Sequence, residues 1–264
     1  MVSQTSYFRP PTNRDIPVWR YMDLTKFVWM LHRRALYLSR ASAMNDPYEG
    51  YYTQKMAPSE ESEERFVRMM LSRRTHPPLD EQTTVNELRS FYRRFLNKDG
   101  LKVTTDVFYV SCWHMNEEES SAMWKLYTSH GDSVCVKSTY NQLSQELPEH
   151  CYLGCINYID FQAEIFDVYD FLNFVVHKRK SFEHERELRA VINIGEATNR
   201  GLSYTLINDS NAVVVPINLS RVVNEVYVSP DAKPPFLEVV QQLISKYDLD
   251  VPVKQSEVNA PPAY

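Results

Sequence analysis

The sequence predicts an α+β fold: a single domain built on a mixed, mainly antiparallel sheet, with a helical pair inserted into it. The chain has 264 residues, of which 43% are apolar and 24% charged, as is typical of one large globular domain with a substantial core. Short apolar runs alternate with amphipathic stretches along most of its length, which predicts strands alternating with helices. Residues 59–96 carry only helical periodicity, so they are predicted to be an insertion.

The first part of the chain is predicted to form a strand, a helix and a second strand. Residues 24–35 place apolar side chains on one face at helical spacing. Short apolar runs at 18–22 and 36–39 flank this helix, and Asn45-Asp46-Pro47 marks a turn because proline disfavours a helical residue before it. Residues 1–17 carry three prolines and are expected to form an extended N-terminal segment.

The insertion is predicted to consist of two amphipathic helices, at 59–74 and 84–96. Both expose arginines. The preferred interpretation is a solvated face, and the alternative is a basic patch for an anionic partner. The arginines concerned are Arg68, Arg73, Arg74, Arg89, Arg93 and Arg94.

From residue 107 onward strands and helices alternate again, so the domain is expected to span 18–255 and the tail 256–264 to be flexible. Apolar runs predict the strands, and apolar residues three or four apart predict the helices. The expected strands are 107–113, 133–137, 153–159, 188–194, 213–219 and 222–228, and the expected helices are 120–130, 163–177 and 236–247.

Composition excludes several classes of protein. With only 6 glycines and no glycine-rich phosphate motif, a phosphate-cradling loop is not expected. A net charge of −5 argues against non-specific duplex binding by the whole surface. No apolar run approaches the roughly 20 residues of a membrane span, and the N-terminus lacks a signal-peptide core. The four cysteines lack metal-ligand spacing, so we expect a cytoplasmic protein with free thiols, no metal and no membrane contact.

Three polar clusters lie at predicted strand ends or turns, where sites are usually built. The first runs from Ser39 to Gly50, although Asn-Asp-Pro is also a common turn. The second runs from Trp113 to Tyr127. The default explanation of its aromatic residues is packing, and that of His114 is a local hydrogen bond.

The third cluster precedes and enters a predicted buried strand. In an extended chain Glu185, Glu187 and Arg189 share one face, since side chains repeat every second residue. Two carboxylates and a guanidinium at the mouth of such a strand perturb each other's ionisation. This coupling marks either a functional site or a structural ion-pair network.

Together these clusters resemble the uncharacterised prokaryotic domain-of-unknown-function family 2971. The resemblance spans residues 18–194, with departures at Met44 and Phe182, where the family has an aromatic residue and a tryptophan. The matching residues are Trp19-Arg20-Tyr21, Leu36-Tyr37-Leu38-Ser39, Asn45-Asp46-Pro47-Tyr48-Glu49, Ser111, Met123-Trp124, Tyr127, Gly131, Lys178 and Glu185-x-Glu187-x-Arg189.

The order of these parts also resembles that of the ADP-ribosyltransferases, which implies NAD as a substrate. On this resemblance Glu187 is the catalytic carboxylate, which stabilises an oxocarbenium-like transition state at the nicotinamide ribose. Glu185 would orient the acceptor or act as the base, and Arg189 would anchor the pair. The implied NAD-binding residues are Tyr21 and Ser39 in the nicotinamide pocket, Trp113, Trp124 and Tyr127 in its aromatic wall, Arg20 or Lys178 at the pyrophosphate, and Asn45, Asp46 and Glu49 in the adjoining loop.

The leading hypothesis is therefore an ADP-ribosyltransferase or NAD glycohydrolase, a toxin or phage-defence effector whose macromolecular acceptor is a protein or a nucleic acid. Two alternatives stay open. One is a nuclease, metal-dependent or not, whose helical pair grips nucleic acid. The other is a non-catalytic binding or inhibitor module. The nuclease centre would consist of Asp46, Glu49, Glu185, Glu187 and Lys178.

Overall fold

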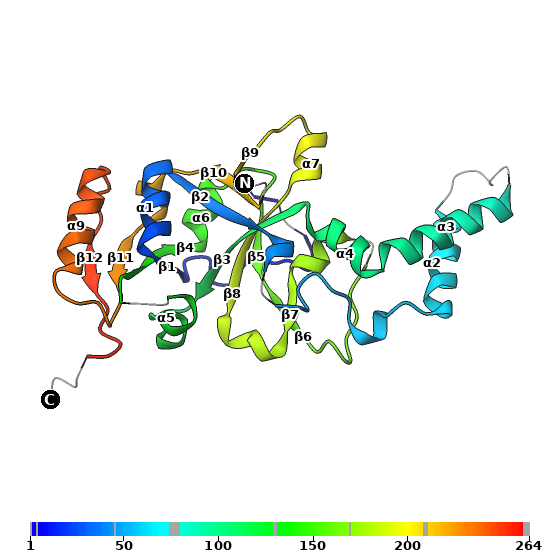
Figure 1. Cartoon of the computed structure of the whole chain (residues 1–264), viewed down its shortest axis with the longest axis horizontal. Coiled ribbons are helices and arrows are strands. Elements are labelled where there is room, and N and C mark those ends of the chain that lie inside the picture. Colours follow the sequence, from blue (N-terminus) through cyan, green and yellow to red (C-terminus); the bar gives the residue numbers. More distant parts are fainter. Residues whose placement is uncertain are drawn as a thin grey trace.

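The central feature of the molecule is a mixed sheet (Figure 1). The computed structural model describes residues 2–3, 5–44, 46–73, 80–128, 131–168, 170–207 and 211–260. Within these residues the sheet has ten strands, in the order β12-β11-β4-β1-β3-β2-β10-β9, with β8 and β5 added from β3. The strands are β1 (Pro17–Asp23), β2 (Ala35–Arg40), β3 (Phe108–Met115), β4 (Ser133–Thr139), β5 (Tyr152–Cys155), β8 (Glu187–Asn193), β9 (Thr205–Ile207), β10 (Ala212–Pro216), β11 (Glu225–Val228) and β12 (Val253–Gln255).

Four helices cover one face of this sheet and bury the larger part of the core. Side chains such as Leu31, Leu143 and Val240 pack from them onto strand residues such as Val136 and Ala190, all at most 1% exposed. The fold class predicted from the sequence, α+β with a mainly antiparallel sheet, is thereby confirmed. The helices are α1 (Leu24–Arg33), α6 (Tyr140–Glu146), α8 (Leu219–Val222) and α9 (Phe236–Lys246).

The opposite face carries shorter elements and holds the candidate site. Trp124 of α5 (Ser121–Tyr127) packs there against Tyr21, with ring centroids 5.0 Å apart. The rest of this face is covered by 3₁₀ turns and a parallel strand pair. These are two 3₁₀ helices (Phe171–Val175 and Lys180–Glu185), β6 (Asn157–Ile159) and β7 (His177–Arg179).

The sheet forks at its centre, along one edge of β3. β1 pairs with this edge only near Met115, and β2 pairs with it only near Tyr109, so the two strands separate over residues 111–113. β8 occupies the whole of the other edge. Arg20 of β1 bridges the fork, because its Nη2 donates to the carbonyl oxygen of Tyr37 in β2 at 3.0 Å.

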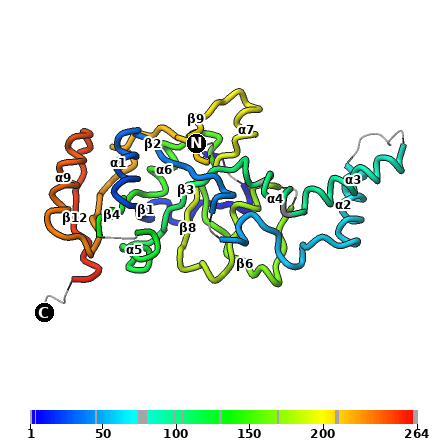
Figure 2. The backbone as a smooth tube through the Cα atoms, in the orientation of Figure 1, coloured from blue at the N-terminus to red at the C-terminus, as the bar shows by residue number. Residues whose placement is uncertain are grey.

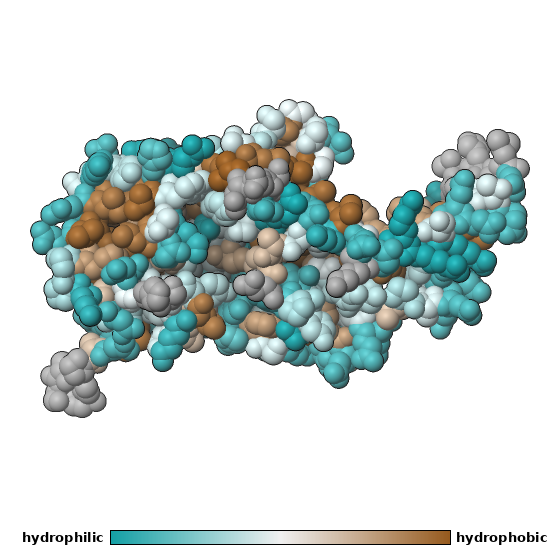
Figure 3. Space-filling view, viewed as in Figure 1, coloured by the Kyte–Doolittle hydropathy of each residue, from teal (hydrophilic) through white to brown (hydrophobic). Residues whose placement is uncertain are grey.

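The predicted insertion forms an arm between β2 and β3 (Figure 2). Ser59 caps its first helix and Asp80 its second, each accepting from backbone amides of the first turn. Phe66 and Tyr92 hold the helices together, and their cluster reaches Phe174 in the body. In Figure 3 the surface of the arm on this side is predominantly hydrophilic. The arm consists of α2 (Glu60–Ser72) and α3 (Glu81–Phe95), followed by α4 (Lys98–Thr105).

One predicted helix is wrong. The described residues of 163–177, all but residue 169, contain only the 3₁₀ helix Phe171–Val175 and the first residue of β7. Polar side chains there bind nearby backbone groups and compete with helical hydrogen bonds. Asp170 accepts from the amide of Leu172 at 3.1 Å, and Asn173 donates to the carbonyl of Asp167 at 2.9 Å.

Three predicted strands have clearly different limits, and one of them, 222–228, begins only at Glu225 because Val222 ends α8. The expected strand 153–159 is divided, since β5 pairs with β8 whereas β6 leaves the main sheet and pairs with β7. The expected strand 213–219 ends at Pro216, and Asn218 then caps α8 by accepting from the amide of Ser220 at 3.1 Å.

Both ends of the chain pack on the body where they are described. Phe8 is 1% exposed, and the amide of Cys155 donates to the carbonyl of Arg9 at 2.8 Å. Near the other end, Ser256 donates to Glu119 at 2.6 Å, and residues 261–264 of the expected tail lie outside the described part. None of the described helices has the length and apolar character needed to cross a membrane.

Candidate active site

The registers of three strands determine which side chains meet on the shorter-element face. His114 of β3 lies opposite Glu187 of β8 and opposite Trp19 of β1. Cys112, two residues earlier, lies opposite Arg189. Directly paired residues of antiparallel strands share a face of the sheet, so these five side chains point to the same side.

A small pocket lies over these residues, with a volume of about 30 Å³. Its floor comes from β1, β3 and β8, and α5 closes it with Met123 and Tyr127. Of the residues predicted for the site, the structure brings five to this pocket. They are Tyr21, Trp113, Tyr127, Glu185 and Glu187, but the ring of Trp113 packs on the helix-covered face and so does not form the predicted aromatic wall.

Glu187 is the most constrained carboxylate of the pocket, at 3% exposure. Arg189, which is fully buried, donates to it through Nε at 2.5 Å and Nη2 at 3.0 Å. Lys178 adds an ion pair at 3.1 Å through Nζ. Burial by itself would raise the pKa of Glu187, but Arg189 and Lys178 outweigh it and hold the pKa well below its usual range. Glu187 is therefore a fixed anion at neutral pH.

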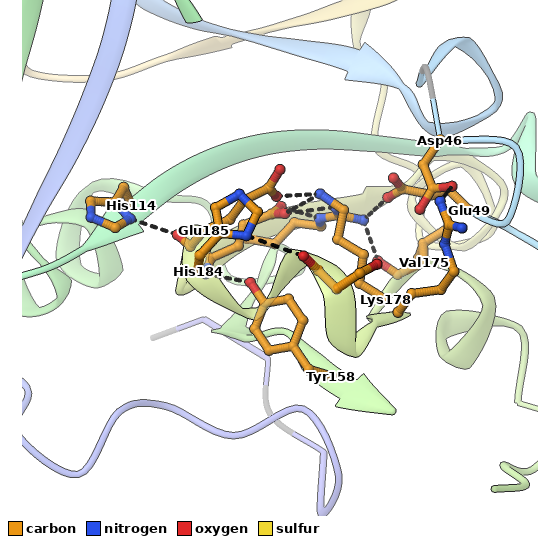
Figure 4. Close-up of polar contacts among 12 residues, drawn as sticks. Asp46, Glu49, His114, Tyr158, Val175, Lys178, His184 and Glu185 are labelled. Atoms are coloured by element: carbon orange, nitrogen blue, oxygen red, sulfur yellow. Dashed lines mark hydrogen bonds and ion pairs between the residues drawn. The ribbon is translucent and has the colours of Figure 1, made fainter. Parts of the chain in front are cut away.

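Two further carboxylates complete the cluster (Figure 4). Glu185 accepts from Lys178 Nζ at 2.5 Å, and Glu49 accepts from Arg189 Nη1, which also donates to the carbonyl of Val175 at 2.7 Å. Burial raises the pKa of Glu49 despite Arg189. Three carboxylates thus share two cations, and each cation has a partner besides Glu187.

The default expectation for His114 was a local hydrogen bond, but its hydrogen-bond partner lies 71 residues away in the sequence. The ring is 7% exposed, and Nδ1 lies 2.6 Å from the backbone carbonyl oxygen of Glu185. Nε2 is buried, and no group of the described residues hydrogen-bonds to it. Trp19, Cys112 and Met123 also line the pocket, and none of these three or His114 was assigned to the site from the sequence. Strand alternation could have found Cys112 and His114, since they lie two residues apart.

Several predicted NAD-binding residues lie elsewhere. Arg20 pairs with Val136 on the helix-covered face, where it lies over the ring of Trp113 at 5.7 Å, so it is not beside Glu187. Ser39 shares the site face but lies opposite Val110, four residues along β3 from His114, or about 13 Å.

Trp124 and Asp46, also predicted to bind NAD, make contacts that hold the fold together and do not line the pocket. Trp124 packs beneath Tyr21, and its Nε1 donates to Glu119 at 2.9 Å. Asp46 is paired with Arg179 at 2.9 Å, a residue that does not line the pocket. Asn45 lies outside the described residues.

The predicted arginine patch is partly neutralised. Arg93 makes two hydrogen bonds to Glu63, at 2.6 and 3.0 Å, and Arg89 pairs with the same carboxylate at 3.5 Å. Both arginines also line a groove on α3 with Arg94, whereas Arg74 lies outside the described residues. Across the described chain, no three His, Cys, Asp or Glu side chains are grouped so as to hold a metal ion.

Comparisons with known proteins give structural likenesses only. No protein-family model matches the sequence, so the resemblance to domain-of-unknown-function family 2971 stays a prediction. No curated protein matches it either. Among solved structures the chain is similar to DarT from Thermus sp. 2.9 in complex with ADP-ribosylated ssDNA, at 7% identity and a TM-score of 0.40, over 95% of this chain and 98% of that one.

The same DarT in complex with NAD+ matches at 6% identity, with a TM-score of 0.39 over 94% of this chain and 98% of that one. In complex with carba-NAD+ it matches at 7% identity, with a TM-score of 0.37 over 94% and 97%. Likeness at this level does not transfer an activity, so the chemistry of this pocket is argued from its own side chains.

Proposed function

We propose that the chain is an NAD-consuming enzyme, an ADP-ribosyltransferase or NAD glycohydrolase, with its reaction at Glu187. The observation that carries this proposal is a buried carboxylate, held ionised by Arg189 and Lys178, in the floor of a pocket walled by aromatic rings. The resemblance of the sequence to the ADP-ribosyltransferase order of parts supports the same assignment. The protein would act inside the cell, as a toxin or defence effector, on a protein or nucleic-acid acceptor.

A fixed carboxylate suits the chemistry of breaking the bond between nicotinamide and ribose. The electron pair of that bond leaves with the nicotinamide, and positive charge develops on the ribose carbon. Glu187 would stabilise this charge without any reorganisation, because Arg189 and Lys178 already hold its two oxygens in place. An anion held in this way favours the transition state over the ground state.

The aromatic residues suit the leaving group. Trp19, Tyr21 and Tyr127 line the pocket, and a planar heteroaromatic ring stacks favourably on such side chains. The volume of about 30 Å³ holds roughly one water molecule, so a nicotinamide ring enters only when the pocket widens. Tyr127 is 45% exposed at the end of α5, and rotation of its side chain would open the pocket.

The test is a pair of substitutions at Glu187. Glu187→Gln removes the charge and keeps the shape, and we expect nicotinamide release to fall by at least about 100-fold, the usual effect of losing one preorganised electrostatic group. Glu187→Asp keeps the charge but withdraws it by one methylene, so its loss should be smaller. Nicotinamide would be quantified by chromatography.

NAD binding, followed by calorimetry, should persist in both variants, and circular dichroism would control for folding. Release of nicotinamide by Glu187→Gln at the wild-type rate would disprove the assignment. A wild-type protein that neither binds nor cleaves NAD would disprove the function itself.

A further inference from the structure

Transfer of ADP-ribose to an acceptor leaves one proton to be removed, and the cluster around Glu187 is poorly suited to accept it. Both oxygens of Glu187 are engaged, and its lowered pKa makes it a weak base. Glu185 is ion-paired to Lys178 Nζ at 2.5 Å. Either carboxylate would have to break a buried ion pair on accepting a proton, which is costly.

His114 has the opposite arrangement. A backbone carbonyl can only accept a hydrogen bond, so the contact of 2.6 Å between Nδ1 and the oxygen of Glu185 places the proton on Nδ1. In the neutral ring Nε2 then carries a lone pair. This nitrogen is buried, lacks a hydrogen-bond donor among the described residues, and belongs to a side chain that lines the pocket. A buried acceptor without a donor is costly unless a ligand supplies one.

The charged and titratable surroundings keep this ring neutral. Burial is the main cause that lowers the pKa of His114, and Arg186 and His184 lower it further. The carbonyl and carboxylate of Glu185 act in the opposite direction and are outweighed. At neutral pH the ring is therefore in its basic form.

The remaining titratable groups of the pocket are protonated. Burial and the carboxylate of Glu187 raise the pKa of the Cys112 thiol. Burial also raises the pKa of Tyr21 and of Tyr127. His114 thus offers the pocket a neutral ring with an unengaged lone pair on Nε2, and accepting a proton there breaks no ion pair.

We propose that His114 Nε2 is the general base that accepts the proton of the attacking acceptor, and that the acceptor is consequently a neutral O–H or N–H nucleophile. This inference rests on the proposed function. The bond from ribose carbon to nicotinamide nitrogen breaks with its electron pair going to nicotinamide. A bond forms from the same carbon to the acceptor oxygen or nitrogen, and the acceptor proton moves to Nε2. The imidazolium then releases that proton to solvent.

The charge of the cluster restricts the acceptor further. A carboxylate acceptor carries no proton to give, and it would approach three buried carboxylates, Glu49, Glu185 and Glu187, that share only two cations. Hydroxyl, amide or imide groups avoid this repulsion and donate directly to Nε2. Water fits the same description, which is the glycohydrolase outcome.

The experiment compares His114 with His177, because both are buried and in both Nδ1 contacts a backbone carbonyl oxygen. His177 donates through Nδ1 to the carbonyl of Asn173 at 2.8 Å and is 8% exposed, but it does not line the pocket. His114→Asn keeps a donor for the carbonyl of Glu185 and removes Nε2, and His177→Asn is the matched control. We expect His114→Asn to lose about 10²–10⁴-fold in single-turnover nicotinamide release with NAD affinity retained. His177→Asn should stay within a few-fold of wild type.

The pH profile separates a base from a packing residue. Wild-type turnover should rise as pH increases through a pKa below 6.5, the ordinary histidine value, and then level off, and His114→Asn should lack this rise. Imidazole added to His114→Ala should restore part of the rate. A wild-type rate, or an unchanged rise with pH, in His114→Asn would overturn the inference and leave the proposed function standing. Absence of NAD cleavage by wild type would overturn both.

Discussion

At the level of single residues, the features that make Glu187 suitable for catalysis also stabilise the fold. Arg189 is fully buried in the middle of the sheet, and a buried guanidinium is tolerated only when carboxylates and carbonyls satisfy it. Glu187 supplies two of these contacts. The proposed catalytic role and the solvation of Arg189 therefore depend on the same carboxylate.

The dual role of Glu187 predicts a pH dependence of stability. Because its pKa is lowered in the folded protein, Glu187 contributes stability that is fully present above its ordinary pKa of 4.5 and is lost as pH falls through the folded-state value. Wild type should unfold at a higher urea concentration than Glu187→Gln at pH 7, and the difference should shrink as pH falls from about 4.5 to about 2. Equal differences at all pH values would contradict this ionised, paired state.

At the level of elements, the sequence pattern predicted strands better than it predicted what connects them. The helix 24–35 and the flanking strands follow from periodicity, and the structure agrees. The stretch 163–177 has helical periodicity as well, but Asp170 and Asn173 bind neighbouring backbone groups instead. Such competition depends on tertiary context, which spacing does not contain.

In the candidate site as well, strand alternation predicted some neighbours correctly, whereas contacts between distant segments could not be predicted. The alternation correctly placed Glu187 and Arg189 on one face of β8, but it was wrong for Glu185, which ends the 3₁₀ helix Lys180–Glu185 and reaches the cluster through Lys178. Arg20 was assigned to the site from its motif, yet strand alternation directs it to the opposite face from Tyr21. The tautomer of His114 is set by the backbone carbonyl of Glu185, 71 residues along the chain, and no local sequence pattern reveals that contact.

The N-terminal segment provides a test at this scale. Gly154 of β5 lies against Phe8 so closely that a Cβ there would be 2.9 Å from the backbone and ring of Phe8. We expect Gly154→Ala to cost about 1–3 kcal/mol of unfolding free energy, seen as a lower thermal midpoint. Gly195→Ala in α7 (Ile194–Asn199), where the nearest atom would be 3.3 Å away, is the control and should be near neutral. Equal midpoints for both variants would mean that the segment is not docked.

At the level of the whole molecule, the arm projects away from the body and from α9 and β12 (Figure 2). It is attached through Phe174 and α4, and its own apolar cluster is small. Its arginines differ in role, since Arg93 holds the largely buried Glu63, with 11% of that side chain exposed, and Arg94 lines the outer groove. The arm is thus both a packed unit and a candidate surface for an anionic acceptor.

Charge reversal distinguishes these roles. Arg93→Glu should destabilise the arm, because it replaces a bidentate partner of Glu63 with a like charge. Arg94→Glu should leave the thermal midpoint nearly unchanged. If the arm contacts a nucleic-acid acceptor, Arg94→Glu should weaken binding of a fluorescent single-stranded oligonucleotide and lower the salt dependence by about one ion. Identical anisotropy curves across a salt series would assign Arg94 to solvation only.

The ion pair between Glu49 and Arg189 joins residues 140 positions apart, and this separation affects the order of events during synthesis. While the ribosome is still producing the arm and the middle strands, Glu49 has been made but the strand that carries Arg189 and Glu187 has not. The cluster around Glu187 therefore forms only after β8 has been made, and chains that end before residue 187 lack it. Under the proposed function, NAD cleavage would therefore start only once β8 has been synthesised and has paired with β3.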